Sequence, residues 1–252
     1  MKGRVIVAGL GPSDPAHITP LVTQAINMAT DVIGYIPYIA RIQPRDGMTL
    51  HATDNRVEVE RAQHALELAY KGRIVLIVSS GDPGVFAMAA ALFEVVEKDS
   101  LKWQDIEIEI LPGITAMLAA AAKAGAPLGH DFCVINLSDN LKPWSIIEKR
   151  VQLALAADFA IAFYNPRSKS RPAGFEKTLT ILKENCADNR PVIFARNVSC
   201  EDESINIVPL LKTTANMADM RTLVIVGSSQ SRLVLQHNKK WVYTPRHYPM
   251  LP

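Results

Sequence analysis

The most informative segment of this chain runs Ile74-Val-Leu-Ile-Val-Ser-Ser-Gly-Asp-Pro-Gly-Val-Phe86. Its aliphatic run ends at Val78, and it is too short for a membrane span and too apolar for a strand with one wet face. It predicts a parallel strand buried on both faces. Small residues from Ser79 to Gly84 then turn the chain before an apolar helix, expected from Val85 to about Glu97. Because open α/β sheets bind ligands at the carboxyl ends of their strands, this turn is a candidate ligand loop.

Two more loops of the same kind leave apolar strands through glycine and proline. The first lies in Val5-Ile-Val-Ala-Gly-Leu-Gly-Pro-Ser-Asp14, and the second in Ile110-Leu-Pro-Gly-Ile-Thr-Ala116. Each loop alone is typical of an ordinary turn between a strand and a helix. Three such loops at strand ends together predict one shared cleft.

The first of these loops does not fit a nucleotide-binding fingerprint. Asp14 stands where a dinucleotide-binding turn has its third glycine, and Pro12 removes a backbone N–H that would face the pyrophosphate. The lysine signature of a phosphate-binding loop does not occur in the sequence either. The sequence therefore disfavours nicotinamide-dependent and nucleotide-hydrolysing activities.

The composition indicates a globular protein with no general surface for membranes or nucleic acid. The chain has 252 residues, of which 48% are hydrophobic, and a formal net charge of +2. This length allows one large α/β domain or two small ones, and so small a charge does not indicate binding to nucleic acid or to anionic membranes. No apolar stretch of the sequence reaches the length of a bilayer span, so we expect a soluble, cytoplasmic protein. The cysteines, Cys133, Cys186 and Cys200, lack the spacing of a metal site and are expected to be free, buried thiols.

Strand and helix patterns alternate along the whole chain, which predicts two α/β domains, residues 1–127 and 128–252. Strands are expected at residues 5–8, 32–33, 74–78, 106–110, 132–137, 159–164, 192–195 and 222–226, and helices at 19–29, 57–70, 85–97, 112–123, 143–156 and 175–185. The strand 106–110 alternates in polarity, so it should have one wet face or lie at a sheet edge. Residues 205–211 are ambiguous, and we favour a strand followed by a short helix.

Aromatic and basic side chains follow the second predicted strand. Tyr35 and Tyr38 could cover an aromatic ligand, although partial burial in the core is the commoner role of such residues. Arg41 and Arg45 come next, on a loop or a short helix. They are either anion contacts or surface charges.

A basic loop, residues 164–172, follows the apolar strand at 159–164. It carries Arg167, Lys169 and Arg171 at the end of a strand, where a loop would overlook a cleft. These side chains form either a carboxylate or phosphate clamp or a solvated turn.

Five motifs occur together along the chain. In order they are Gly9-Leu-Gly-Pro-Ser-Asp14, Ser80-Gly-Asp-Pro83, Pro112-Gly-Ile-Thr-Ala116, Phe163-Tyr-Asn165 and Arg196-Asn-Val198. This ordered set resembles the tetrapyrrole methyltransferase superfamily, which uses S-adenosyl-L-methionine, and the resemblance covers nearly the whole chain. It implies two α/β domains with the cofactor cleft between them, which is the class III S-adenosylmethionine-dependent methyltransferase fold, usually in a homodimer.

Longer segments are similar to one branch of that superfamily, the ring-contracting C17-methylases of cobalamin synthesis. These segments are Ala126-Pro-Leu-Gly-His-Asp-Phe-Cys-Val-Ile-Asn-Leu-Ser-Asp139, Lys142-Pro-Trp-Ser-Ile-Ile-Glu148, Tyr164-Asn-Pro-Arg-Ser168 and Tyr243-Thr-Pro-Arg246. The resemblance implies methylation of precorrin-3B at carbon 17 with ring contraction to precorrin-4. The cofactor product is then S-adenosyl-L-homocysteine, and no metal is required.

The resemblance also assigns contacts to the cofactor. The matching positions of the first domain are Pro12, Ser80, Gly81, Asp82, Val85, Thr115 and Ala116, and those of the second domain are Asn165 and Val198. Backbone groups and small side chains at these positions could bind the amino acid and adenine moieties and leave the sulfonium methyl group exposed.

One departure from the superfamily concerns proton transfer. Uroporphyrinogen methylases carry an acidic residue after the tyrosine of the second strand, and here that position is Ile36. This difference argues against uroporphyrinogen as the substrate and means that a base must come from elsewhere. The candidates are Tyr38, His130, Asp131 and Asp139. Histidine is a common general base, although a lone histidine before a strand, as His130 is, is more often structural.

The implied substrate is a tetrapyrrole that carries many carboxylates. The basic residues that could bind them are Arg41, Arg45, Arg167, Lys169 and Arg196. Alternative activities within the superfamily are a cobalt-precorrin-3 C17-methyltransferase and a precorrin-4 methyltransferase, and an alternative outside enzymology is a tetrapyrrole-binding carrier. A ribosomal RNA methylase is disfavoured by the near-neutral charge.

Overall fold

The structure is a computed structural model that describes residues 3–55 and 57–248. The chain divides into two compact units, Met1–Thr115 and Ala116–Pro252. The sequence analysis placed the division after Pro127, so helix α6 (Ala116–Ala124) and the short strand β6 (Gly125–Ala126) now join the second unit. The physical reason is pairing within that unit, because Gly125 and Ala126 pair with Val242 and Tyr243 of strand β13 (Lys239–Tyr243).

The first unit is built on a five-stranded sheet in the order β3-β2-β4-β1-β5. Its strands are β1 (Arg4–Gly9), β2 (Asp31–Tyr35), β3 (Thr49–Thr53), β4 (Ile74–Ser79) and β5 (Glu107–Leu111). Every pairing in this sheet is parallel. Strand β4 lies in the middle and is buried, and β5 lies at an edge with exposed glutamates. Both expectations for these two strands are confirmed, whereas the analysis did not foresee strand β3.

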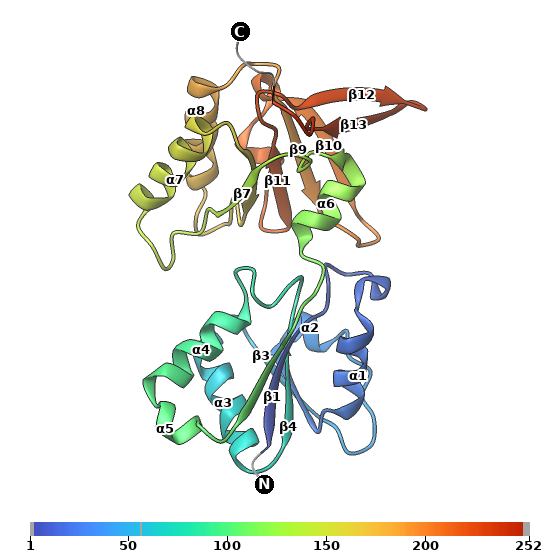
Figure 1. Ribbon diagram of the computed structural model, residues 1–252, viewed down its shortest axis with the longest axis vertical. Helices are drawn as coiled ribbons and strands as arrows, with labels where there is room; N and C mark the ends of the chain where they lie inside the picture. Colours follow the sequence, from blue (N-terminus) through green and yellow to red (C-terminus); the bar gives the residue numbers. More distant parts are fainter. Residues whose placement is uncertain (1–2, 56, 249–252) are drawn as a thin grey trace. The chain divides into compact units, whose positions relative to one another are not determined.

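Helices cover both faces of this sheet, which explains why its central strands are apolar on both sides. Helices α3 (Glu58–Tyr70), α4 (Met88–Lys98) and α5 (Ser100–Trp103) lie on one face, and α1 (Pro20–Met28) and α2 (Ile36–Ile39) lie on the other (Figure 1). Strand β1 shows the alternation directly. Its Val5 and Val7 pack with α3 and α4, and Ile6 and Ala8 pack with α1 and α2.

Helix α4 begins three residues later than expected, at Met88 instead of Val85. Phe86 causes the delay because its φ angle is +53°, a left-handed conformation that a helix cannot contain. Ala87 is then extended and serves as the N-cap. The loop after β4 is therefore longer than the sequence indicated, and it extends from Ser80 to Ala87.

The second unit contains a five-stranded mixed sheet in the order β10-β9-β11-β8-β7. Its strands are β7 (Phe132–Asn136), β8 (Ala160–Tyr164), β9 (Pro191–Arg196), β10 (Ser204–Pro209) and β11 (Thr222–Val226). Strand β7 is parallel to β8, and β11 runs antiparallel between β8 and β9. Strands β7, β8 and β9 therefore point the same way, and their carboxyl ends share one edge. The predicted strand and short helix over 205–211 is confirmed by β10 and the 3-10 turn Leu210–Lys212.

Helices α7 (Trp144–Ala156) and α8 (Gly174–Asn185) cover one face of the second sheet, and α6 lies on the other (Figure 1). The core under α7 and α8 contains Ile147, Phe163 and Phe175, all with 0% exposure. A second, three-stranded sheet, β12-β13-β6, adds a hairpin of β12 (Arg232–Gln236) and β13 that the sequence analysis did not foresee.

Two further features concern membrane-spanning helices and the three cysteines. Among the helices of residues 3–55 and 57–248, none has the length and apolar character needed to cross a bilayer. Within the described residues, Cys133, Cys186 and Cys200 form no disulfide, and they are half-buried instead of fully buried. Burial raises the pKa of the Cys133 thiol to about 11, so this side chain stays protonated.

Candidate functional site

The three glycine-bearing loops of the first unit meet at the carboxyl edge of its sheet, as predicted. Gly11 and Gly81 exchange two backbone hydrogen bonds, with N···O distances of 3.2 and 3.0 Å. The Leu10 N–H also donates to the Ser79 carbonyl, at 2.8 Å. These bonds join the loop after β1 to the loop after β4.

Asp82 joins the loop after β4 to the third loop, which follows β5. Its Oδ2 accepts a hydrogen bond from the Gly113 N–H at 3.0 Å, and its Oδ1 accepts one from the Gly84 N–H at 2.8 Å. Both carboxylate oxygens thus hold backbone N–H groups. The structure indicates that Asp82 shapes the edge by fixing two loops.

Glycine is required at two positions because the loops approach one another backbone to backbone. A Cβ atom at Gly9 would lie 2.9 Å from the Gly113 Cα and would also meet the Gly81 carbonyl oxygen. A Cβ atom at Gly113 would overlap the Gly81 carbonyl oxygen and lie 2.7 Å from the Gly9 oxygen. The result is an edge lined by backbone groups and small side chains, which a ligand could approach closely.

Arg41 and Tyr38 belong to the same edge, whereas Arg45 does not. The Arg41 guanidinium donates to the Leu10 and Gly11 carbonyls, at 2.5 and 3.1 Å. Tyr38 shares a hydrogen bond with Ser80 and lies edge-on to the Tyr35 ring at 5.3 Å. Arg45 donates to the carbonyl of Ala29, which precedes β2 at the opposite edge of the sheet. Its guanidinium is therefore away from the loops.

The residues of the second unit that were predicted to contact the cofactor lie at the carboxyl edge of its sheet. Asn165 follows β8 with a φ angle of +51° and donates from Nδ2 to the Asn136 Oδ1 at 3.1 Å. Val198 follows β9 and is 7% exposed. The Tyr164 hydroxyl accepts from the Met117 N–H at 3.0 Å, which places the first residues of α6 at this edge. Asp139, in the loop after β7, is exposed at the same edge.

The basic candidates of the second unit have different surroundings. Arg171 donates to the Leu137 and Asn165 carbonyls, and Lys169 is exposed. In the described part of the chain, Arg167 Nε is buried and has no hydrogen-bond partner. Arg196 is paired with Asp219 at 2.8 Å and with Asp202 at 3.5 Å. Its positive charge is thus already compensated by two carboxylates of its own unit.

His130 lies at the other edge of the second sheet from Asn165. It precedes β7, and because β7 and β8 are parallel, Asn165 is at the far end of the pair. His130 lines a cavity of about 60 Å³ together with Asp158 and Tyr248, a volume far too small for a tetrapyrrole. Asp131 lies beside it, 3.7 Å from Nδ1. Within the second unit, the structure therefore does not bring His130 or Asp131 together with Asn165.

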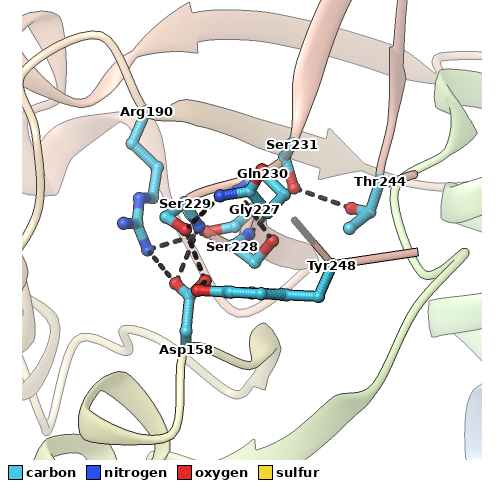
Figure 2. A network of polar contacts seen from close by, with 9 residues as sticks. All are labelled: Asp158, Arg190, Gly227, Ser228, Ser229, Gln230, Ser231, Thr244 and Tyr248. Atoms are coloured by element: carbon cyan, nitrogen blue, oxygen red, sulfur yellow. Dashed lines mark hydrogen bonds and ion pairs between the residues drawn. The ribbon is translucent and has the colours of Figure 1, made fainter. Parts of the chain in front are cut away.

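A polar network at this amino edge has a structural role (Figure 2). The Asp158 carboxylate accepts from the backbone N–H and hydroxyl of Ser229, from the Tyr248 hydroxyl at 3.0 Å and from Arg190 at 3.4 Å. Burial alone would raise the pKa of Asp158, but these hydrogen bonds, chiefly from Ser229, bring it below the usual value. The network ties the segment after β13 to the loops before β8 and β9.

We expect Asp158→Asn to lower the free energy of unfolding by about 2 kcal/mol at neutral pH, because it removes a charge that holds several donors. Asparagine tolerates the left-handed φ of +53° at this position, so backbone strain is not added. Since the folded-state pKa is depressed, the contribution is present above the unfolded pKa and disappears as the pH falls through the folded one. Urea unfolding at several pH values measures this difference.

The matched control is Asp188→Asn, because that carboxylate is exposed and lies outside the Asp158 network. It should leave stability within about 0.5 kcal/mol of the wild type. A difference between Asp158→Asn and wild type that stays constant down to acid pH would contradict the proposed role of the ionised carboxylate.

The sequence analysis missed one buried residue of the first edge, Arg61. Its side chain is 5% exposed and donates from Nε to the Thr53 hydroxyl at 2.8 Å. The signal was present, because Arg61 precedes Ala65 and Ala69 by four and eight residues and so shares the buried face of α3.

Among the described residues, no group of three or more His, Cys, Asp or Glu side chains could hold a metal ion.

The comparisons with known proteins agree with this geometry. The family model described as Tetrapyrrole (Corrin/Porphyrin) Methylases matches residues 4–213. A Precorrin-3B C(17)-methyltransferase from Sinorhizobium sp is 47% identical over 249 residues, which cover 98% of each chain.

Solved structures give the same picture. The crystal structure of the methyltransferase CobJ is 60% identical, with a TM-score of 0.92, and covers 96% of this chain and 100% of that one. A uroporphyrin-III C-methyl transferase from Thermus thermophilus, complexed with S-adenyl homocysteine, shares the fold at 18% identity and a TM-score of 0.68, covering 89% of this chain and 97% of that one. The α/β fold class expected from the sequence is confirmed, and the chain belongs to the family of tetrapyrrole (corrin/porphyrin) methylases.

Proposed function

We propose that this chain is an S-adenosyl-L-methionine-dependent C-methyltransferase that methylates precorrin-3B at carbon 17 and contracts the ring, in cobalamin biosynthesis. The observation that carries the proposal is the 47% identity, over nearly the full length of both chains, with a protein named for that reaction. The joined glycine loops at the first carboxyl edge support it, since they are suited to a ligand approached closely by backbone.

The proposed cofactor contacts from the three loops are Pro12, Ser80, Gly81, Asp82, Val85 and Thr115 of the first unit, with Ala116, the first residue of the second unit. Asp82 acts by holding the loops at Gly84 and Gly113 in place. Asn165 and Val198 are the proposed contacts of the second unit. The neighbour of the same fold that was solved with S-adenyl homocysteine supports this choice of cofactor.

When bound, the cofactor supplies an electrophilic methyl group to a nucleophilic ring carbon, and the chain's own part is to position and desolvate the reactants. The transfer adds one positive charge to the macrocycle. Loss of the proton of a substrate hydroxyl returns the original charge and promotes the ring contraction, in which the extruded carbon becomes an acetyl group. A proton acceptor is therefore required near the ring.

Of the candidate bases, Asp139 is the one whose position supports this role, because it is exposed at the same edge as Asn165. His130 and Asp131 lie at the opposite end of β7. We propose Asp139 as the base. Tyr38 is not proposed as the base, because burial raises the pKa of its phenol.

The basic loop is proposed to bind substrate carboxylates. Replacing Arg167, Lys169 and Arg171 together by methionine should raise KM for the tetrapyrrole about tenfold, if each charge contributes roughly 0.5 kcal/mol. Cofactor affinity should stay unchanged, and the effect on KM should shrink as salt is added. Steady-state kinetics at low and high ionic strength measures both.

The matched control replaces Lys149 and Arg150, exposed on helix α7, by methionine. It should leave KM unchanged. A triple variant with wild-type KM would return the basic loop to a solvated turn. Arg196, which is held by Asp219 and Asp202, is expected to contribute less than the basic loop.

The direct test of the activity is transfer of a labelled methyl group from the cofactor to precorrin-3B by the purified protein. The same assay with cobalt-precorrin-3 and with precorrin-4 separates the alternatives within the family. Turnover confined to precorrin-3B is the expected result, and turnover confined to either other substrate would replace the proposed one. We further propose a cytoplasmic homodimer, which light scattering on the purified protein and fractionation of its host would test.

A further inference from the structure

Arg61 is a buried positive charge without a bonded counter-ion. Its three donor groups reach the Thr53 hydroxyl at 2.8 Å, the Asp54 carbonyl at 2.9 Å and the Met88 sulfur at 3.1 Å. All these acceptors are uncharged, and within residues 3–55 and 57–248 no carboxylate forms an ion pair with Arg61. Glu58 forms no ion pair with Arg61 and acts on it only through its longer-range charge.

Such a charge is unfavourable for folding unless something else uses it. Burial of an unpaired ion is costly, and a thioether is a weak acceptor for a guanidinium. Burial lowers the pKa of Arg61, yet a guanidinium remains charged at any physiological pH. The fold could bury an apolar side chain at this position of α3 with less difficulty. A buried cation of this kind is therefore a candidate for function.

The position of Arg61 points to the ligand edge. It lies in the first turns of α3, Thr53 ends β3, and Met88 begins α4 after the glycine loop. Its three acceptor groups thus come from segments that adjoin the carboxyl ends of β3 and β4. Arg61 is therefore at the same edge of the sheet as the loops that we propose to hold the cofactor.

Tyr38 is the polar side chain on which this charge acts. Tyr38 lies in α2 directly after β2, and β2 lies between β3 and β4 in the sheet, so Tyr38 is at the same edge as Arg61. The groups that act electrostatically on its hydroxyl are Tyr35 from β2, Arg41 after α2, Arg61 from α3 and Ser80 from the loop after β4. Burial and Tyr35 raise the pKa of Tyr38, while Arg41, Arg61 and the Ser80 hydrogen bond act to lower it. The net direction is upward, so the phenol is protonated at neutral pH. Tyr38 is therefore a hydrogen-bond donor, and we do not propose it as the base.

We propose that Tyr38 and Arg61 form an oxyanion-stabilising pair for the tetrapyrrole substrate. The Tyr38 hydroxyl donates a hydrogen bond to the substrate oxygen that becomes negative as it loses its proton. Arg61 is the positioning residue, whose buried charge increases the donor strength of Tyr38 and stabilises the negative oxygen from behind. No bond to Tyr38 breaks, because the proton of the substrate goes to the base. This inference rests on the proposed function and names the group that assists its ring contraction.

The pair predicts specific kinetics. Removing one donor from an oxyanion site slows turnover by about 10²–10³-fold, so Tyr38→Phe should lower kcat to that extent while methyl-donor affinity stays unchanged. Arg61→Met should act through the same step, and the double variant should be about as slow as the slower single one. Arg61→Lys keeps the charge and should recover part of the rate.

A second readout does not depend on substrate. The absorbance of tyrosinate is followed as pH rises, and the Tyr38→Phe titration is subtracted from that of the wild type to isolate Tyr38. In Arg61→Met the Tyr38 phenol should ionise at higher pH than in the wild type, and in Arg61→Lys it should ionise close to the wild-type value. Lys71→Met, at the exposed far end of the same helix, is the control and should change neither titration nor turnover.

The two readouts separate the possible failures. A Tyr38 titration that is identical in the wild type and Arg61→Met overturns the pair, and so does wild-type kcat in Tyr38→Phe. If the wild-type protein transfers no methyl group to any tetrapyrrole, the proposed function fails, and the titration still decides whether Arg61 acts on Tyr38. Circular dichroism on each variant verifies that it is folded before either readout is taken.

Discussion

Replacing Gly113 by alanine should abolish measurable cofactor binding, with at least a hundredfold loss of affinity for S-adenosyl-L-homocysteine. The added methyl group would overlap the Gly81 carbonyl oxygen and lie 2.7 Å from the Gly9 oxygen. Both neighbours are backbone atoms, so neither can rotate away, and the loops must separate. Overpacking of this kind costs about 1–3 kcal/mol, and here it acts on the residues that hold the ligand. Isothermal titration calorimetry measures the binding.

Gly174→Ala is the matched control for this substitution. A Cβ atom at Gly174 would make only an ordinary contact, 3.4 Å from the Trp144 ring, in the first turn of helix α8. Its affinity for S-adenosyl-L-homocysteine should equal that of the wild type. If Gly113→Ala also bound with wild-type affinity, the three loops could not be the cofactor site.

Replacing Asp82 by alanine should weaken S-adenosyl-L-homocysteine binding by about 10- to 100-fold. Each hydrogen bond to its carboxylate contributes roughly 1.5–3 kcal/mol, and the substitution releases the N–H groups of both Gly84 and Gly113. Asp82→Asn should have a smaller effect, because its amide oxygen can still accept from one of them. Calorimetry on both variants gives the order of affinities, which should be wild type, then asparagine, then alanine.

Asp99→Ala provides the comparison for Asp82. Asp99 accepts a hydrogen bond from the Lys102 N–H at the start of α5, far along the chain from the glycine loops. Its removal can cost up to about 1 kcal/mol of stability through the lost cap, but it should not alter cofactor affinity. Equal losses of affinity in Asp82→Ala and Asp99→Ala would show that the effect is general destabilisation.

The parts of the fold that could be predicted are those whose local sequence has a clear apolar, alternating or turn pattern. The aliphatic run of β4 and the alternating Glu107 to Ile110 of β5 each specified a strand and its place in the sheet. The three glycine loops were recognisable because the turn residues follow apolar strands directly. Their meeting follows from parallel topology, which the apolar runs already implied.

Other elements depend on tertiary contacts that the local sequence does not contain. Strand β3 reads Thr-Leu-His-Ala-Thr, and its pairing comes from Thr49 lying opposite Asp31 of β2. The start of α4 depends on the left-handed Phe86, which no rule for phenylalanine would anticipate. Strand β12 carries exposed leucines at 233 and 235, so burial patterns give no guide to it.

Some residues of the candidate site could likewise be predicted from the sequence, and others could be judged only from the structure. Motif positions such as Asp82 could be named from the sequence because the resemblance is position by position. The role of His130 could not be judged, because histidine is a common general base while its position at the amino end of β7 is a property of the sheet. The helical spacing of Arg61 with Ala65 and Ala69 indicated its burial, but its uncharged hydrogen-bond partners are visible only in the structure.

The central claim is that one chain both methylates carbon 17 and contracts the ring. The most direct measurement is NMR and mass spectrometry of the product formed from precorrin-3B and S-adenosyl-L-methionine labelled with carbon-13 in its methyl group. Our account predicts a product one methylene unit heavier, with the label on carbon 17 and a new acetyl group. A label on another carbon, or a methylated product with no acetyl group from the wild-type protein, would contradict it.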